Sequence, residues 1–239
     1  MISVLACTNR RNFVKNIIHN FQKQTLEEKE LLLILNSSEM KEEEIKELLE
    51  KLKIRYRLLQ YPEGMSLGEC LNKSAALASY DYIAKMDDDD YYGTDFLDEA
   101  FQGLIQTKAD VVGKSTFYIY FHPNKELRLY NPNHENRQIL KNGQSPYKSS
   151  YFLSGASLVF RKEILKKVAF PHLNLGEDSG FQRQCYESGM KLYSLSKEYY
   201  AYQRYSEPSH HNSDASEFVL RRNSQFITST PDLEKFMER

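Results

Sequence analysis

The sequence predicts an α/β fold in which strands and helices alternate around a mostly parallel central sheet. Short apolar runs, typical of buried strands, alternate with amphipathic segments through the first half of the chain. Alternation of this kind favours a doubly wound sheet with helices on its faces. Apolar residues make up 41% of the 239 residues, which is enough for a sizeable core.

Each element of the first half has its own signal. Residues 2–6 form an apolar run that ends at a polar turn, and 30–35 form a second such run. Apolar residues at helical spacing predict a helix over 13–21, with Asn12 as its cap, and a charged amphipathic helix over 41–53. The remaining elements of this half are expected as strands at 54–60 and 82–86 and as helices at 67–78 and 96–106.

The second half departs from strict alternation. Residues 110–120 and 127–130 predict the two strands of a hairpin, and the polar stretch 131–150 predicts a long loop or lid. The rest is expected as a strand at 152–160, a helix at 161–168, a helix within 177–189, strand and loop at 191–205, and a short helix at 216–225.

Composition excludes several classes of function. A net charge of −1 gives no general attraction to nucleic acid or to an anionic membrane. Three dispersed cysteines offer neither a disulfide framework nor zinc-ligand spacing, which fits a reducing, cytoplasmic setting. The N-terminus lacks a signal-peptide pattern, and no apolar run reaches the roughly 20 residues of a membrane helix.

Four consecutive carboxylates, Asp87 to Asp90, follow the expected strand 82–86 directly. Adjacent acids repel one another, so a cation is expected among them, and Mg²⁺ or Mn²⁺ prefers oxygen ligands. Open α/β sheets also bind ligands at the carboxyl ends of their strands. The run therefore predicts a metal-assisted site for a phosphate-bearing substrate. A solvated acidic turn and a calcium loop starting at Asp88 are the alternative interpretations.

Four segments, in this order, resemble the family 2 inverting glycosyltransferases of GT-A fold over roughly residues 1–211. They are the strand and turn 3–10, the strand and acidic motif 84–90, the segment 152–161 and the Gly-Glu-Asp motif at 176–178. The resemblance implies one GT-A domain over 1–239, with a Rossmann-like sheet and a smaller acceptor-side β/α portion. It divides into a nucleotide-sugar-binding half at 1–106, an acceptor half at 107–211 and a C-terminal tail at 212–239.

The resemblance also implies a reaction. A sugar moves with inversion from a nucleotide-sugar to an acceptor hydroxyl, assisted by Mn²⁺ or Mg²⁺. Asp89 and Asp87 would ligate the metal, with Asp87 and Asp88 also lining the donor pocket. Asp178 would be the general base with Glu177 beside it, although both acids also suit a helix start.

Further donor-binding residues follow from the same resemblance. Thr8, Asn9 and Arg10 would line the nucleotide pocket, and Arg10 could pair with a phosphate. Asn36 stands where many family members carry acidic residues that contact the base or ribose, and asparagine can bond the nucleotide only without charge. A UDP-sugar is therefore expected as the default donor of the family. Gly64, in a Gly-rich turn, and Lys73 are also expected to bind the donor, with Lys73 reaching the diphosphate, and His210 or His211 would be a further metal ligand.

The acceptor is expected to be a saccharide, lipid-linked or protein-linked molecule, in bacterial-type surface glycan or glycoconjugate synthesis. No nucleic acid partner is expected. A lipid-linked acceptor would bring the protein to the inner membrane face without spanning the membrane. The sequence is also compatible with a homo-oligomer. The chain has no tryptophan, so it lacks the Gln-x-x-Arg-Trp motif of processive members. A non-processive hexosyl- or related transferase is therefore expected.

Two functions from other classes remain alternatives. The loss of an acid at Asn36 would suit a catalytically degenerate GT-A protein that only binds a partner. A sugar-nucleotide pyrophosphorylase would share the architecture and the metal, but the turn after residue 8 lacks the glycines of a triphosphate loop. An aspartyl phosphatase would need a threonine where Tyr91 stands.

Overall fold

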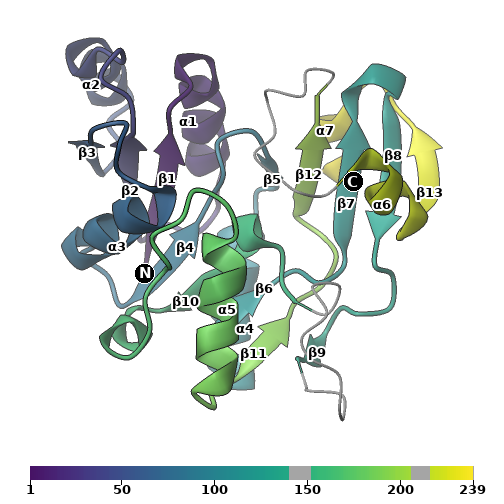
Figure 1. The fold of residues 1–239 in the computed structure, drawn as a ribbon. Helices are drawn as coiled ribbons and strands as arrows, with labels where there is room; N and C mark the ends of the chain where they lie inside the picture. The colour runs from purple at the N-terminus through teal and green to yellow at the C-terminus, as the bar shows by residue number, and fades with distance from the viewer. Residues whose placement is uncertain (140–151, 206–215, 239) are drawn as a thin grey trace.

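A computed structural model describes residues 1–139, 152–205 and 216–238, which form two β-sheets with helices packed around them (Figure 1). The larger sheet has eight strands in the order β3-β2-β1-β4-β10-β6-β11-β9, and the smaller has five in the order β13-β8-β7-β12-β5. The first four strands of the larger sheet are parallel. The expected α/β fold with a mostly parallel sheet is confirmed.

The strands are β1 (Ile2–Thr8), β2 (Lys29–Leu35), β3 (Tyr56–Gln60), β4 (Tyr82–Lys85), β5 (Tyr91–Tyr92), β6 (Val111–Gly113), β7 (Phe117–Phe121), β8 (Glu126–Tyr130), β9 (Arg137–Gln138), β10 (Val159–Arg161), β11 (Leu192–Ser194), β12 (Tyr200–Arg204) and β13 (Ser224–Ser229). The α-helices are α1 (Val14–Gln22), α2 (Glu42–Lys51), α3 (Leu67–Leu77), α4 (Phe96–Thr107), α5 (Glu177–Glu187), α6 (Glu217–Arg222) and α7 (Leu233–Met237), and short 3-10 helices cover Arg11–Phe13, His122–Asn124, Gly155–Ser157 and Lys162–Lys166.

The core of the larger sheet follows the two-residue period of a strand. In β1, Val4 and Ala6 pack into the cluster that also holds residues of α1, α2 and α4. Leu5 points to the other face and joins the cluster that holds residues of α3 and α5. Both faces are therefore covered by helices, which explains why β1 and β2 are apolar almost throughout.

The smaller sheet is built mainly from the second half of the chain. β7 and β8 form an antiparallel hairpin, as predicted, and β12 runs parallel to β7. β5, which follows the acidic run directly, pairs with β12. The two sheets therefore meet at the acidic run, and Figure 1 shows β5 on the side of the smaller sheet that faces the larger one.

Several predicted boundaries were wrong. Residues 110–120 do not form one strand, because β6 lies in the larger sheet and β7 in the smaller, with 114–116 between them. Segment 152–160 is a strand only from Val159, because the Ser157 amide and hydroxyl both donate to the Ser154 carbonyl and close a 3-10 turn. The helix expected over 161–168 is shorter, a 3-10 helix at Lys162–Lys166, and Asn12 lies inside a 3-10 turn instead of capping α1.

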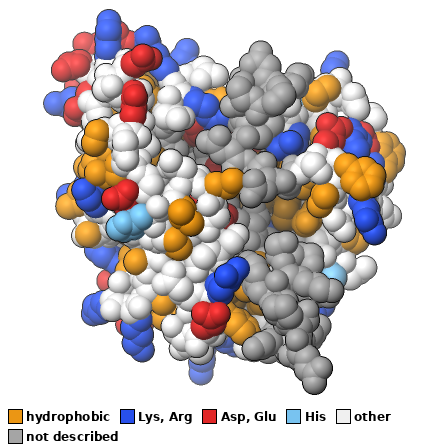
Figure 2. All heavy atoms as spheres, viewed as in Figure 1, with side chains coloured by type: hydrophobic (Ala, Val, Ile, Leu, Met, Phe, Trp, Pro, Cys, Tyr) orange, Lys and Arg blue, Asp and Glu red, His pale blue; other side chains and the backbone are white. Residues whose placement is uncertain are grey.

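The outer surface agrees with the charge pattern of the sequence. Figure 2 shows acidic and basic side chains gathered over α2, at the upper left, where the sequence predicts a charged amphipathic helix. Within the described residues, no helix is both long and apolar enough to cross a membrane. The division of the chain at residues 106 and 211 stays a prediction. The loop or lid predicted at 131–150 lies outside the described residues from 140 on, and its described part contains the short strand β9.

Candidate active site

The carboxyl ends of β1 and β4 lie side by side, because the two strands are parallel neighbours. Thr8 ends β1, and its hydroxyl donates to the Asp88 carboxylate. Arg10 follows in the next turn, and its guanidinium pairs with Asp88 and with the Asp89 carboxylate, the latter at 2.9 Å. The turn after β1 and the acidic run therefore lie together at the carboxyl edge of the parallel strands.

Asp90 holds the acidic run in place. Asp90 is 1% exposed, and its carboxylate accepts hydrogen bonds from the Tyr200 hydroxyl at 2.7 Å and from the Gln203 backbone amide at 3.1 Å. Both donors lie on β12, so Asp90 fastens the motif to the smaller sheet. Burial, together with the negative charges of Asp89 and Asp87, raises the pKa of Asp90.

Asp87 faces a different partner from its neighbours. Its carboxylate accepts from the Lys85 ammonium at 2.5 Å, and its backbone amide donates to the Tyr92 hydroxyl at 2.8 Å. The same Lys85 nitrogen lies 3.7 Å from the Glu177 carboxylate. Lys85 therefore joins the acidic run to the Glu-Asp motif at the start of α5, and the two acidic segments predicted from sequence share one site.

Asp178 lies in the first turn of α5, where its carboxylate accepts from the Ser179 amide at 2.6 Å. The helix begins after Gly176, whose φ of 82° is in the left-handed region that favours glycine. A Cβ at Gly155 would lie 1.3 Å from Asp178 Oδ2, so the carboxylate fits only because that position is a glycine. The base candidate is thus packed against the segment 154–157.

The loop before α5 is fixed by α3. The Asn72 side chain exchanges hydrogen bonds with the backbone carbonyl and amide of Phe170, at 2.8 and 3.0 Å. Gly68 donates to the Leu173 carbonyl at 3.1 Å, and a Cβ there would collide with the Pro171 carbonyl at 1.8 Å. These contacts set where the Glu-Asp motif starts.

The other predicted donor-binding residues lie at the same edge with looser connections. Asn36 donates its backbone amide to the Thr8 carbonyl at 2.9 Å, while its side chain donates to Pro62. Asn9 and Gly64 are exposed. Lys73 is exposed too, and its ammonium lies over the Tyr61 ring at 5.9 Å. His210 and His211, which are predicted as metal ligands, lie outside the described residues.

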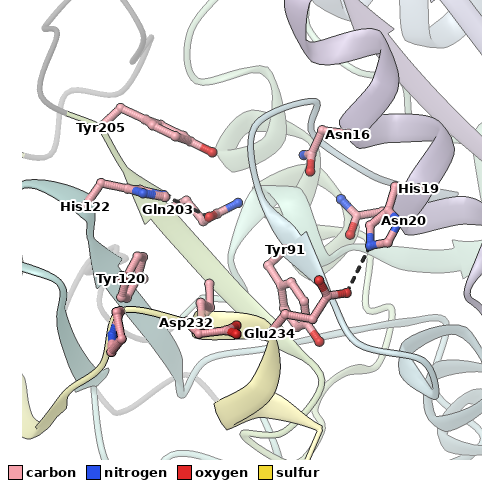
Figure 3. A pocket seen from close by; sticks show the side chains of 12 residues that line it. Asn16, His19, Asn20, Tyr91, Tyr120, His122, Gln203, Tyr205, Asp232 and Glu234 are labelled. Carbon is pink, nitrogen blue, oxygen red and sulfur yellow. Dashed lines mark hydrogen bonds and ion pairs between the residues drawn. The ribbon is translucent and has the colours of Figure 1, made fainter.

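A cavity of about 380 Å³ lies behind the acidic run, between α1 and the smaller sheet (Figure 3). Asn16 faces it from α1 and donates to the backbone carbonyls of Asp88 and Asp90, at 2.8 and 3.0 Å. From the opposite wall, Gln203 donates to the Asp89 carbonyl at 3.0 Å and contacts His122. The walls of this cavity therefore hold the backbone of the acidic run.

The chemistry of the donor set fits a hard divalent cation. Two cationic side chains, Arg10 and Lys85, pair with four of the six carboxyl groups of the two acidic segments: Asp88 and Asp89 with Arg10, and Asp87 and Glu177 with Lys85. Among residues 1–139, 152–205 and 216–238, no three His, Cys, Asp or Glu side chains converge as a complete protein ligand set. Mg²⁺ is commonly held by one or two carboxylates with substrate phosphates and water, and such a site needs no third side chain.

Two carboxyl groups have raised pKa values. Burial, reinforced by the Asp88 charge, raises the pKa of Asp89 to about 6, although Arg10 opposes the shift. Burial also raises the pKa of Glu177 to about 7, with Lys85 acting in the opposite direction. Both groups are therefore protonated at a higher pH than ordinary acids.

The Glu177 shift predicts a pH dependence of stability. Its pKa rises on folding, so the folded state binds a proton between pH 4.5 and 7 that the unfolded state has lost. As the pH rises through that window, the free energy of unfolding therefore falls by up to about 3 kcal/mol. Glu177→Gln should remove this fall, measured by urea unfolding at pH 5 and 8. Glu187→Gln, at the exposed end of α5, is the matched control. Equal pH slopes in wild type and Glu177→Gln would contradict the assignment.

Sequence reasoning missed four contributors to the site: Lys85, Asn72 as an anchor, Gly155 and Gln203. Lys85 carried a signal, since a lysine stands alone in an otherwise apolar strand. Asn72 and Gln203 act through contacts with residues far along the chain, and no local pattern marks such contacts.

Fold and site together define a GT-A type α/β protein with an acidic site at the carboxyl edge of its parallel strands. The family model for glycosyl transferase family 2 matches residues 3–169. The chain belongs to this family, and the resemblance noted from its motifs is confirmed.

Relatives of the chain agree with this assignment. Glycosyltransferase GlyA of Streptococcus pneumoniae serotype 4 (strain ATCC BAA-334 / TIGR4) is 21% identical over 203 residues, covering 81% of this chain and 29% of GlyA. The structure of S. aureus TarS 1-349 superposes with a TM-score of 0.66 at 20% identity, over 84% of this chain and 60% of that one.

Some of the similar structures contain ligands, among them a complex of TarS 1-349 with UDP. TarS 1-349 in complex with UDP-GlcNAc gives a TM-score of 0.61 at 17% identity, over 91% of this chain and 63% of TarS 1-349. Mannosyltransferase PcManGT from Pyrobaculum calidifontis, in complex with GDP-Man and Mn²⁺, gives 0.60 at 13% identity, over 85% and 56%. This chain spans less than two thirds of each of these relatives.

Proposed function

We propose that the chain is a metal-dependent glycosyltransferase that moves a sugar from a nucleotide-sugar to an acceptor hydroxyl with inversion. One observation carries the proposal: two acidic segments, far apart in the sequence, lie in one site and share the Lys85 ammonium. The end of β4 would take the donor, and the start of α5 would face the acceptor. The complexes of TarS with UDP-GlcNAc and of PcManGT with GDP-Man support a nucleotide-sugar donor.

Asp178 is proposed as the general base. Its carboxylate takes the proton of the acceptor hydroxyl while that oxygen bonds to the anomeric carbon. The nucleoside diphosphate leaves with the electron pair of the broken bond, so a direct displacement needs no protein nucleophile. Asp178 Oδ1 is occupied by the Ser179 amide, and the Oδ2 atom lies towards Gly155.

Asp89, together with Asp87, would hold Mn²⁺ or Mg²⁺, which supplies Lewis-acid stabilisation of the charge that develops on the diphosphate. Thr8 and Arg10 orient the acidic run, and Arg10 is placed to move from Asp89 to a phosphate oxygen. We propose UDP as the nucleotide, supported by the UDP and UDP-GlcNAc complexes of TarS.

A second candidate function rests on Arg10. Its guanidinium already neutralises Asp88 and Asp89, where a divalent cation would bind. A degenerate member of the family could keep this arrangement permanently and bind a partner without metal. The two functions differ in whether nucleotide binding requires a divalent ion.

Thermal unfolding with UDP, GDP, CDP or dTDP, with and without Mn²⁺, tests the proposal. A nucleotide at 100 times its Kd stabilises the fold by about 2.7 kcal/mol. That corresponds to a Tm rise of roughly 5–10 °C for a chain of this length. We expect the rise for UDP with Mn²⁺ and little without it. No rise for any nucleotide would favour the degenerate function.

A further inference from the structure

Lys85 is a buried cation in the centre of the larger sheet. It ends β4, its side chain is 4% exposed, and its backbone amide donates to the Leu158 carbonyl at 2.8 Å. Burial of an ammonium group is costly unless it is paired. Its partners are Asp87 at 2.5 Å and Glu177 at 3.7 Å, so its charge is compensated entirely from the two acidic segments.

The first turn of α5 packs against Gly155 and against the loop that α3 fixes, but these contacts involve no ion pair. Its N-terminal cap is Gly176, which has no side chain to accept from the free amides of the turn. Within the turn, Gly180 donates to the Gly176 carbonyl and Ser179 to the Asp178 carboxylate. The ion pair from Glu177 to Lys85 is the charged contact between this turn and the central sheet.

We propose that Lys85 is a positioning residue for the transfer reaction: by holding Asp87 and Glu177 on one ammonium, it fixes Asp178 relative to the donor. The inference rests on the proposed function. Glu177 is followed directly by Asp178, so a fixed Glu177 sets the turn from which the base projects. A displacement of about 1 Å between reacting groups can cost about 100-fold in rate.

Lys85→Met keeps the length and apolar stem of the side chain and removes only the charged head. We expect donor turnover, measured as hydrolysis with water as the acceptor, to fall about 100-fold. The KM for the donor should change less than the turnover, because Asp87 keeps its carboxylate for the metal while Glu177 loses its ion pair to the sheet. Lys85→Arg should recover at least tenfold of the loss, since the guanidinium restores the charge.

Lys114→Met is the matched control. Lys114 is also fully buried and pairs with a single glutamate, Glu99, but it lies outside the site. Its loss should lower the Tm and leave turnover unchanged. If Lys114→Met lowers turnover as much as Lys85→Met at equal Tm, Lys85 has only a structural role and the proposal fails.

Lys85→Met leaves two carboxylates without their cation and could unfold, so a double variant keeps the test decisive. Lys85→Met with Glu177→Gln removes the orphaned charge as well. If Lys85 acts through Glu177, the double variant should turn over donor at the rate of Glu177→Gln alone. If the double variant instead loses rate by the product of the two single-variant losses, the proposal is overturned.

Hydrogen exchange separates this inference from the proposed function. In Lys85→Met, the amides of residues 179–181 should exchange at least tenfold faster than in wild type, and in Lys114→Met they should not. Unchanged exchange would overturn the positioning role whatever the activity. If wild type shows no metal-dependent donor binding but Lys85→Met still exchanges faster, the proposed function fails while the positioning of α5 stands.

Discussion

Replacing Asp178 with asparagine should lower the rate of sugar transfer about 10³-fold and leave donor binding within about threefold. Asparagine has the same shape but cannot take the proton of the acceptor hydroxyl, and a general base typically contributes 10²- to 10⁴-fold. Among the described residues, no hydrogen bond joins the Asp178 side chain to Thr8 or Asp88, which are proposed to bind the donor. Single-turnover rates at saturating donor isolate the chemical step.

Gly155→Ala is the companion variant, because it displaces Asp178 without removing it. The new Cβ would meet Asp178 Oδ2 at 1.3 Å, so the carboxylate must turn away. We expect a loss of rate in the same direction as Asp178→Asn, with donor binding again unchanged. Wild-type transfer by Asp178→Asn would exclude it as the base. Loss of donor binding in that variant would place Asp178 on the donor side instead.

The parts of the fold that local pattern encodes were predictable. Apolar runs located β1 and β2 to within two residues, because strands buried on both faces are apolar without interruption. The prediction failed where turn chemistry competes with an apolar run, as at Ser154 and Ser157. β13 was missed because its six residues are mostly polar or exposed, and its strand conformation depends on pairing with β8.

The candidate site was predictable as a list of acids, but its internal geometry was not. The acidic run was visible because four like charges rarely follow a buried strand without a function. Which acid faces which cation depends on β10 lying beside β4 and on α5 packing across the sheet. In the sequence, Lys85 is visible only as a single charge in an otherwise uncharged strand, and the fold places it between Asp87 and Glu177.

Asp89→Asn should weaken nucleotide binding in the presence of Mn²⁺ about 100-fold and leave metal-free binding unchanged. The Asp89 carboxylate contacts Arg10 and is the acid proposed to ligate the metal, and an amide is a poorer ligand for a hard cation. Titration calorimetry with UDP, with and without Mn²⁺, gives both affinities. Metal-dependent binding that survives in Asp89→Asn would contradict the metal assignment.

Asp90→Asn, one residue further along, gives the control that distinguishes a ligand from an anchor. Asp90 accepts from the Tyr200 hydroxyl and the Gln203 amide, so its loss should cost about 1–3 kcal/mol of stability. It is buried towards the smaller sheet, and nucleotide binding should therefore still depend on Mn²⁺. Neighbouring acids would then have opposite profiles: Asp89→Asn loses the metal dependence and keeps the fold, whereas Asp90→Asn loses stability and keeps the metal dependence. If the two variants behave alike, the acidic run acts as one undivided charge, and the separate roles assigned to Asp89 and Asp90 are wrong.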